Sequence, residues 1–491
     1  MTLATYANVE TISTHAAAQT HPANSITAIS ALTKSYTGAA GVQVSCWPGW
    51  WDGSSTPTTN ASGTGANIRT NQTGARITVE VTGTKIFGIK FDTSIWDATN
   101  KDGEPWITRP SFWCYRLTTD GTPGSWVYGN RASASASGWI FLHSLTTTST
   151  YVIEMEPTHI TDPINVTAPS GISLLDFVRE PQLTGTAGYP VNEQGAFQQI
   201  TGFVTTTGAT FNNVTFAQAA LNVMVYGDSN THGQVSAGTD ATVELAEVGS
   251  TSGDGLELDA RGHRITFVRQ MLETWATANN KRLVICNSSY GGLWLGAMHN
   301  TIRLAYAAGY GAYNLSASPI NRVQHRHGWT SYLAPTFTEA ARPLPSGWTP
   351  DLAVVALVTN DQVIGDAAIG NGITGDPLNH HVDTLFRDDA VSFINAVHAA
   401  WASCKVLAIN NQLSDTSFSV GVASHYYFDI ACRAGYLDLD ATNWGRYADL
   451  RSLVSTTVIP DNRNTSTHLT PTQHTAAATA LATTLNTLMG L

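Results

Sequence analysis

The stretch LNVMVYGDSNTHG, residues 221–233, joins an apolar run to a polar turn. Its first six residues predict a short strand that is buried on both faces. Gly227 then permits a sharp turn, and Asp228 and Asn230 favour turns and helix starts. A serine between such a strand and a helix lies where open α/β sheets bind their ligands, near backbone N–H groups suited to an oxyanion. Ser229 is therefore a candidate nucleophile, and a helix cap is the alternative interpretation.

The composition describes a long, acidic and weakly charged chain. Its 491 residues predict two or three domains. Hydrophobic residues make up 42% and charged residues only 12%, the net charge is -11, and the sequence contains no basic run. Nucleic acid and anionic membranes are therefore poor partners, whereas a neutral polysaccharide is electrostatically permitted.

The N-terminus lacks the basic and apolar regions of a signal peptide, and no apolar run reaches membrane-spanning length. We therefore expect a protein without a membrane span. Its localisation stays open, with an extracellular or a virion-associated place among the alternatives. The oligomeric state is equally open.

Five cysteines are scattered along the chain: Cys46, Cys114, Cys286, Cys404 and Cys432. Cys286 and Cys404 lie in apolar, strand-like runs, which favours buried free thiols. A disulfide between Cys46 and Cys114 stays open as an alternative for that pair. No Cys or His residues have the spacing of a zinc site, so we expect no metal and no other cofactor.

Residues 1–40 are rich in Thr and Ala. Ile26, Ile29 and Leu32 have a weak helical spacing, so the segment is either a docking arm or a packed first helix.

Residues 41–216 contain short alternating runs separated by turn residues. Two runs, 76–82 and 85–91, are joined at Gly83 and predict a hairpin. The other predicted strands are 112–118, 125–128, 138–143 and 150–155. This pattern predicts a β-sandwich, similar to a jelly roll. Tryptophans are frequent here, and those of the CWPGWWDG segment at 46–53 either fill the core or form a platform for sugars.

Residues 217–491 alternate between apolar strands and amphipathic helices. The predicted strands are 221–226, 282–286, 352–358, 405–409 and a shorter candidate, 435–439. Helical spacing is present at 265–275 and at 382–401, and a last helix begins at Pro471 behind the N-cap Thr470. Such an alternation predicts a parallel sheet that is covered by helices on both sides.

Four short motifs follow predicted strands or open the last helix: GDSNTHG at 227–233, NSSYGG at 287–292, TND at 359–361 and HLTP at 468–471. In type, order and context they resemble the blocks of the SGNH (GDSL-type) hydrolase family, over about residues 218–491. The resemblance implies a three-layer α/β/α, flavodoxin-like domain with a parallel sheet. It also implies a serine esterase.

The resemblance assigns a role to each motif. Ser229 is the implied nucleophile and His468 the general base that enters the last helix. The oxyanion hole is formed by the backbone N–H groups of Ser229 and Gly292 and by the side-chain amide of Asn360.

Two positions depart from the family pattern. Val358 stands where the third block normally has glycine, which changes the pocket floor without removing Asn360. Thr465 occupies the usual position of the triad aspartate, three residues before His468. Asp461 is the nearest upstream carboxylate and is the candidate third member. The alternative is a backbone carbonyl that orients the imidazole.

The predicted substrate is a short acyl ester, above all an O-acetyl group, carried by a carbohydrate. This choice follows the carbohydrate-esterase branches that the layout resembles. One alternative is a lipid, aryl-ester or thioester hydrolase. The other is a non-catalytic carbohydrate-binding or virion structural protein with a degenerate hydrolase domain.

Overall fold

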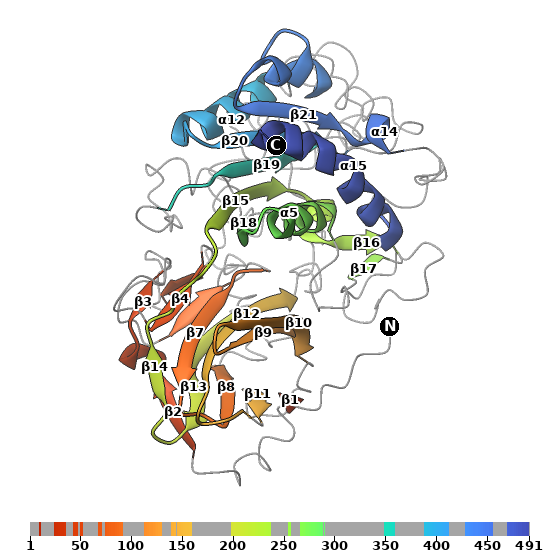
Figure 1. Ribbon diagram of the computed structural model, residues 1–491. Helices are drawn as coiled ribbons and strands as arrows, with labels where there is room; N and C mark the ends of the chain where they lie inside the picture. Colours follow the sequence, from red (N-terminus) through yellow and green to blue (C-terminus); the bar gives the residue numbers. More distant parts are fainter. Residues whose placement is uncertain are drawn as a thin grey trace, which may run out of the picture.

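The protein is represented by a computed structural model (Figure 1). It describes residues 9–10, 24–35, 43–47, 50–52, 67–70, 74–91, 112–129, 139–143, 145–159, 198–236, 254–256, 266–287, 289, 348–358, 387–411, 428–454 and 469–490. None of the helices within these ranges is long and apolar enough to cross a membrane.

The first half of the chain forms two sheets of seven strands each. One sheet has the order β1-β11-β8-β13-β6-β5, and β2 also pairs with β13. Its strands are β1 Val9–Glu10, β2 Asn24–Ala28, β5 Trp50–Asp52, β6 Ile68–Thr70, β8 Ile86–Phe91, β11 Trp139–His143 and β13 Gln198–Thr206.

The second sheet has the order β10-β9-β12-β7-β4-β3, and β14 also pairs with β7. Its strands are β3 Lys34–Ser35, β4 Val44–Cys46, β7 Ile77–Thr82, β9 Phe112–Thr119, β10 Thr122–Gly129, β12 Thr150–His159 and β14 Thr210–Asn212. All described pairings in the two sheets are antiparallel except that of β3 with β4.

Side chains from both sheets form one hydrophobic core. Val79 and Val81 of β7 contribute from one sheet, and Phe87 and Ile89 of β8 contribute from the other. Each pair has the two-residue spacing that directs side chains to one face of a strand. We call the described residues from β1 to Phe216 the β region.

The predicted hairpin at Gly83 is wrong, because β7 and β8 belong to different sheets. Gly83 does adopt a left-handed conformation, with φ of 77°. The turn is held by β13 instead: the Thr206 N–H donates to Thr84 Oγ1 at 3.0 Å, and the Lys85 N–H donates to Thr206 Oγ1 at 2.9 Å. The chain therefore crosses from one sheet to the other over the edge of the shared core.

Of the two alternatives for residues 1–40, a packed first helix through Ile26, Ile29 and Leu32 is wrong, since Ile26 lies in strand β2 and only Ile29–Ala31 forms a short 3-10 helix. Ile26 is 51% exposed, while Ile29 and Leu32 are buried in the core of the β region. The pairing of β2 with β13 satisfies its backbone and outweighs the weak helical pattern.

The second half of the chain contains a parallel sheet of five strands with the order β18-β15-β19-β20-β21. The strands are β15 Ala220–Gly227, β18 Arg282–Asn287, β19 Leu352–Ala356, β20 Lys405–Asn410 and β21 Gly445–Asp449. Numbered along the chain, this order is 2-1-3-4-5, as in flavodoxin-like sheets. We call the described residues from β15 onward the α/β region, and the predicted parallel sheet is confirmed.

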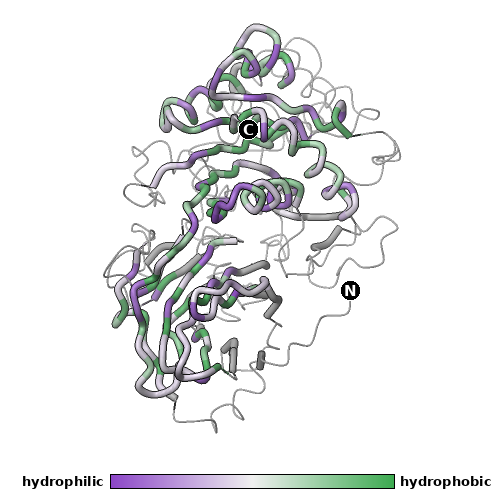
Figure 2. Tube along the Cα trace, viewed as in Figure 1, coloured by the Kyte–Doolittle hydropathy of each residue, from purple (hydrophilic) through white to green (hydrophobic). Residues whose placement is uncertain are grey.

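Helices cover both faces of this sheet. Val223 and Val225 of β15 share a core with helix α5 (Phe267–Ala278) and helix α15 (Pro471–Met489). Tyr226 points to the other face, where its ring meets Phe393 of helix α12 (Arg387–Ala400) at a centroid distance of 5.2 Å. Figure 2 shows the hydrophobic residues of the sheet in the middle of the α/β region, between the helices.

The predicted strand at 435–439 is wrong, and the fifth strand is β21 at Gly445–Asp449. Gly435 and Asp438 have φ angles of 106° and 44°, which an extended strand does not accommodate. Leu439 is buried in a short 3-10 helix, Leu439–Ala441, against Gly445. A Cβ at position 445 would lie 2.3 Å from Leu439 Cδ2, so a larger residue there would displace the Leu439 side chain.

All five cysteines are buried free thiols, including Cys46 and Cys114. Burial, followed by the nearby Glu156 carboxylate, raises the pKa of the Cys114 thiol well above its usual value.

Candidate active site

The sheet order predicts a ligand-binding crevice at the carboxyl ends of β15 and β19. These two strands are neighbours, and the order along the sheet reverses between them, which is where flavodoxin-like folds bind ligands. β15 ends at Gly227, and a four-residue helix, α4 (Ser229–His232), follows after Asp228. The predicted strand-turn-helix context of Ser229 is therefore confirmed.

Gly227 is required by a close approach within this turn. A Cβ at position 227 would lie 2.3 to 2.5 Å from the side-chain atoms of Thr231 in α4. The sequence suggested glycine for its freedom in a sharp turn, but the structure shows that space for Thr231 is the reason. Helix α4 can therefore lie directly against the end of β15.

The Asp228 carboxylate holds the turn to the neighbouring strands. It is fully buried; its Oδ1 accepts from the Asn230 N–H at 3.0 Å, and its Oδ2 accepts from Asn411 Nδ2 at 2.9 Å. Asn411 follows β20 directly, and its Nδ2 also lies 3.4 Å from the Ala356 carbonyl at the end of β19. Asp228 thus ties the serine turn to the ends of two further strands.

Asn411 was not among the site residues that the four motifs predicted. The signal was nevertheless present, because Asn410 and Asn411 are polar residues at the end of an apolar strand, in the same position as the other motifs. Both are buried, and Asn410 Nδ2 donates to the Tyr447 hydroxyl at 3.3 Å. Burial raises the pKa of that hydroxyl well above its usual value.

Asn230 connects the serine turn to the start of the last helix. Its Oδ1 accepts a hydrogen bond from the Leu469 N–H at 3.1 Å, across 239 positions of sequence. Asn230 and Leu469 are both buried, and Leu469 directly follows His468 in the chain. The first and the last of the four motifs are thereby in direct contact.

The start of α15 is fixed by its own cap. Thr470 is the N-cap, its hydroxyl accepts from the Gln473 N–H, and the Gln473 side chain accepts from the Thr470 N–H at 2.8 Å. This capping box with Pro471 at the first helical position confirms the predicted helix start. One turn later, the buried His474 accepts from the Phe267 N–H through Nδ1 at 3.1 Å, which links α15 to the start of α5.

The second motif begins at the same edge of the sheet, whereas the third, at 359–361, lies outside the described residues. Asn287 ends β18, and its Oδ1 accepts from the Ser289 N–H at 2.9 Å in a tight turn. Val358 is buried directly behind β19. Gly292, Asn360, Asp461, Thr465 and His468 lie outside the described residues, as does the side chain of Ser229.

Comparison with known proteins gives matches only among solved structures: no protein-family model and no curated protein matches the sequence. A carbohydrate esterase family 2 enzyme with a carbohydrate-binding domain, from Corynascus thermopiles (Myceliophthora fergusii), matches at 15% identity with a TM-score of 0.50. That alignment covers 91% of this chain and 100% of the other.

A family two carbohydrate esterase from Cellvibrio japonicus matches at 14% identity and a TM-score of 0.49, over 95% of this chain and 98% of the other. A putative GDSL-like lipase from Bacteroides ovatus matches at 9% identity and a TM-score of 0.42, over 86% of each chain. The likeness to the Corynascus enzyme confirms, at the level of the fold, the resemblance that the four motifs indicated.

Proposed function

We propose that the protein is a serine esterase that hydrolyses short-chain acyl esters, principally O-acetyl groups, on carbohydrate. The hydrogen bond between Asn230 and the Leu469 N–H carries this proposal, because it holds the residue after His468 against the helix that begins with Ser229. The name of the Corynascus enzyme, which shares the fold, supports the choice of a carbohydrate ester.

In the proposed reaction, the Ser229 hydroxyl attacks the ester carbonyl while His468 takes its proton. The backbone N–H groups of Ser229 and Gly292 and the side-chain amide of Asn360 donate to the oxyanion, each contributing about 3 kcal/mol in the transition state. His468 then protonates the leaving alcohol. Water repeats the cycle on the acyl-enzyme, releasing the acid and restoring the serine.

Asp461 is the proposed partner of the second imidazole nitrogen. A carboxylate there would fix the tautomer of His468 and stabilise the imidazolium that forms during attack. A backbone carbonyl is the alternative acceptor.

The proposed division of the chain has a β-sandwich up to residue 216 and a catalytic domain at 217–491. The boundary predicted at residue 40 is not kept, because β2 and β3 pair within the two sheets. The common core of the two sheets in the β region supports a sandwich. The β region would then contribute to the choice of ester, by binding carbohydrate, and not to the chemical steps.

The test is hydrolysis of p-nitrophenyl acetate together with acetate release from acetylated glycans. The wild-type protein should hydrolyse both, Ser229→Ala should hydrolyse neither, and a fluorophosphonate probe should label Ser229. Since the mechanism uses no metal, activity should survive a chelator. Labelling of another serine would overturn the assignment of the nucleophile.

The same assays separate the alternatives. Activity on long-chain or thioester substrates that exceeds activity on every acetylated glycan would identify a lipid or thioester hydrolase. A folded protein that binds glycans but is neither labelled nor active would be a carbohydrate-binding or structural protein with a degenerate hydrolase domain.

A further inference from the structure

A pocket of about 190 Å³ lies where the β region meets the α/β region. The β region contributes Arg76, Arg116 and Trp126 to its lining, and the other side includes Gln218, Glu273, Thr277, Asn280, Lys281 and Arg282. Arg282 is the first residue of β18, whereas the candidate active site lies beyond the last residue, Asn287. The two ends are roughly 16 Å apart along the strand, so the pocket is separate from the crevice.

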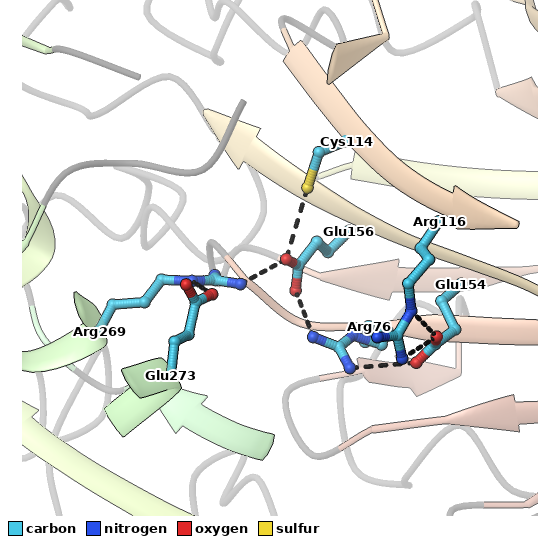
Figure 3. Close-up of polar contacts among 7 residues, drawn as sticks. All are labelled: Arg76, Cys114, Arg116, Glu154, Glu156, Arg269 and Glu273. Atoms are coloured by element: carbon cyan, nitrogen blue, oxygen red, sulfur yellow. Dashed lines mark hydrogen bonds and ion pairs between the residues drawn. The ribbon is translucent and has the colours of Figure 1, made fainter. Parts of the chain in front are cut away.

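The carboxylates near this pocket already have cationic partners (Figure 3). Glu154 binds Arg76 at 3.2 Å and also Arg116, both within the β region. Glu156 binds Arg76 at 3.5 Å and Arg269 of α5 at 2.5 Å.

The third carboxylate, Glu273, binds Arg269 at 2.8 Å on the same helix. The three carboxylates are therefore engaged by Arg76, Arg116 and Arg269, and Arg282 forms none of these ion pairs.

Arg282 is a buried cation without an acceptor among the described residues. Arg282 is 9% exposed, and its Nε and Nη1 atoms make no hydrogen bond within the described part of the chain. The guanidinium lies 3.4 Å from the ring centroid of Phe216 and 4.4 Å from that of Trp47. These rings attract a cation but do not replace a hydrogen-bond acceptor.

The surroundings of Arg282 are positive as well. Burial, followed by repulsion from Arg76, lowers the pKa of the Arg282 guanidinium to about 9; attraction by Glu154 opposes this shift, and Arg116 adds a smaller repulsion. Arg282 therefore remains charged at neutral pH. The described lining includes four basic residues, Arg76, Arg116, Lys281 and Arg282, and one acidic residue, Glu273. Arg76 and Arg116 are paired with Glu154 and Glu156 behind the lining, which leaves Arg282 and Lys281 as the cations outside these ion pairs. This local excess of positive charge stands in a chain whose net charge is -11.

We propose that this pocket binds a carboxylate carried by a sugar ring, as in an acidic glycan. Arginine donates from a planar fork that matches a carboxylate, and an anion would provide the acceptor that Arg282 lacks. Arg76 and Arg116 lie 4.6 and 5.3 Å from the ring centroid of Trp126, which holds both guanidinium groups at the pocket wall.

The neutral part of the lining supports a sugar rather than a bare anion. Gln218, Thr277 and Asn280 offer amide and hydroxyl groups to sugar hydroxyls, and Gln218 Nε2 donates to Asn280 Oδ1 at 3.1 Å. Cavities of about 150 Å³ hold a six-membered ring, so the volume is sufficient. The choice of a sugar as the carrier of the carboxylate rests on the proposed function. The choice of an anionic ligand rests on the charges around Arg282.

The experiment is direct titration of the full-length protein with glucuronate, glucose and acetate, followed by calorimetry or by NMR. None of these ligands is an ester, so the result does not depend on hydrolysis. We expect glucuronate to bind. Glucose lacks the carboxylate and acetate lacks the sugar ring, so each should bind at least about tenfold more weakly. Arg282→Gln should weaken glucuronate binding by about tenfold or more.

Lys85→Gln is the matched control, since it removes an exposed positive charge at the turn after β7, away from Arg76 at the start of that strand. It should leave glucuronate binding unchanged. If Arg282→Gln fails to fold, Arg282→Lys is the second variant. It keeps the positive charge but lacks the planar guanidinium group, so it should still weaken glucuronate binding. The proposal is overturned if the wild type does not bind glucuronate, or if the Arg282 variants bind it as tightly as the wild type. If acetate binds as tightly as glucuronate, the ligand is an anion and the proposed sugar ring is wrong.

Discussion

Two buried polar clusters organise this protein, and they are built differently. At the candidate active site, one carboxylate, Asp228, accepts from a backbone N–H and from the neutral amide of Asn411. Between the two regions, Glu154 and Glu156 are held by three arginines, and Arg282 is left over. The first cluster positions a turn, whereas the second joins two parts of the chain and leaves a positive charge for a ligand.

The difference follows from the cost of burying charge. A buried carboxylate that receives directed hydrogen bonds is fixed in orientation and defines the geometry around it. A cluster of ion pairs tolerates some displacement of each partner, but it is strongly destabilised when one partner is removed. Activity should therefore respond to changes in the first cluster, and stability to changes in the second.

The largest expected effect concerns the residue that orients His468. If Asp461 is the triad carboxylate, Asp461→Asn should lower kcat by about 10⁴-fold, with KM and stability nearly unchanged. Steady-state kinetics on p-nitrophenyl acetate measures this, beside His468→Ala. Unchanged kcat in Asp461→Asn would assign the role to a backbone carbonyl, and Thr465→Asp should then raise the rate.

The second cluster is tested by Arg269→Leu, which removes the partner of Glu156 and Glu273 from α5. Breaking a buried pair should lower the free energy of unfolding by about 3–5 kcal/mol. Urea unfolding measures this, and activity on a small aryl acetate should persist where the variant is folded. Arg433→Leu, which breaks the exposed pair with Asp429, should cost only about 1 kcal/mol. An equal loss of unfolding free energy in the two variants would contradict the distinction between the buried and the exposed ion pair.

The link between the first and last motifs is tested by Asn230→Ala, which removes the acceptor of the Leu469 N–H. The segment that carries His468 should shift relative to the serine turn, and kcat should fall by about 10²-fold. Asn279→Ala is the control, because its amide donates to the Trp275 carbonyl at the end of α5, away from the crevice. Full activity in folded Asn230→Ala would show that the contact does not position the base.

The smallest effect is expected at the start of α15. Thr470→Ala removes the capping box and should lower the free energy of unfolding by about 1 kcal/mol. Thr479→Ala, on the exposed side of the same helix, should change it by less than about 0.5 kcal/mol. Thermal or urea unfolding distinguishes the two, and a larger loss in Thr479→Ala would contradict this account of the helix start.

The elements of the α/β region were predictable because their signals are local. The apolar runs at 221–226, 282–286 and 405–409 are strands of the sheet, and Thr470-Pro471 begins the last helix. The order of the four motifs also indicated the fold. Each motif follows a predicted strand or opens a helix, and this position can be recognised in the sequence without knowing the motif's tertiary contacts. By itself, then, the sequence determined four of the five strands of the parallel sheet and the start of the last helix, and it indicated the sheet edge at which we propose the active site.

Strand pairing and the polar links between motifs required the tertiary structure. Residues 76–91 have the alternation and the glycine of a hairpin, yet β7 and β8 enter different sheets, because each pairs with strands far away in the sequence. The hydrogen bonds from Asn411 to Asp228 and from Leu469 to Asn230 join residues 183 and 239 positions apart. Such contacts depend on which chain segments become neighbours after folding. Local periodicity and turn preferences do not predict these long-range pairings.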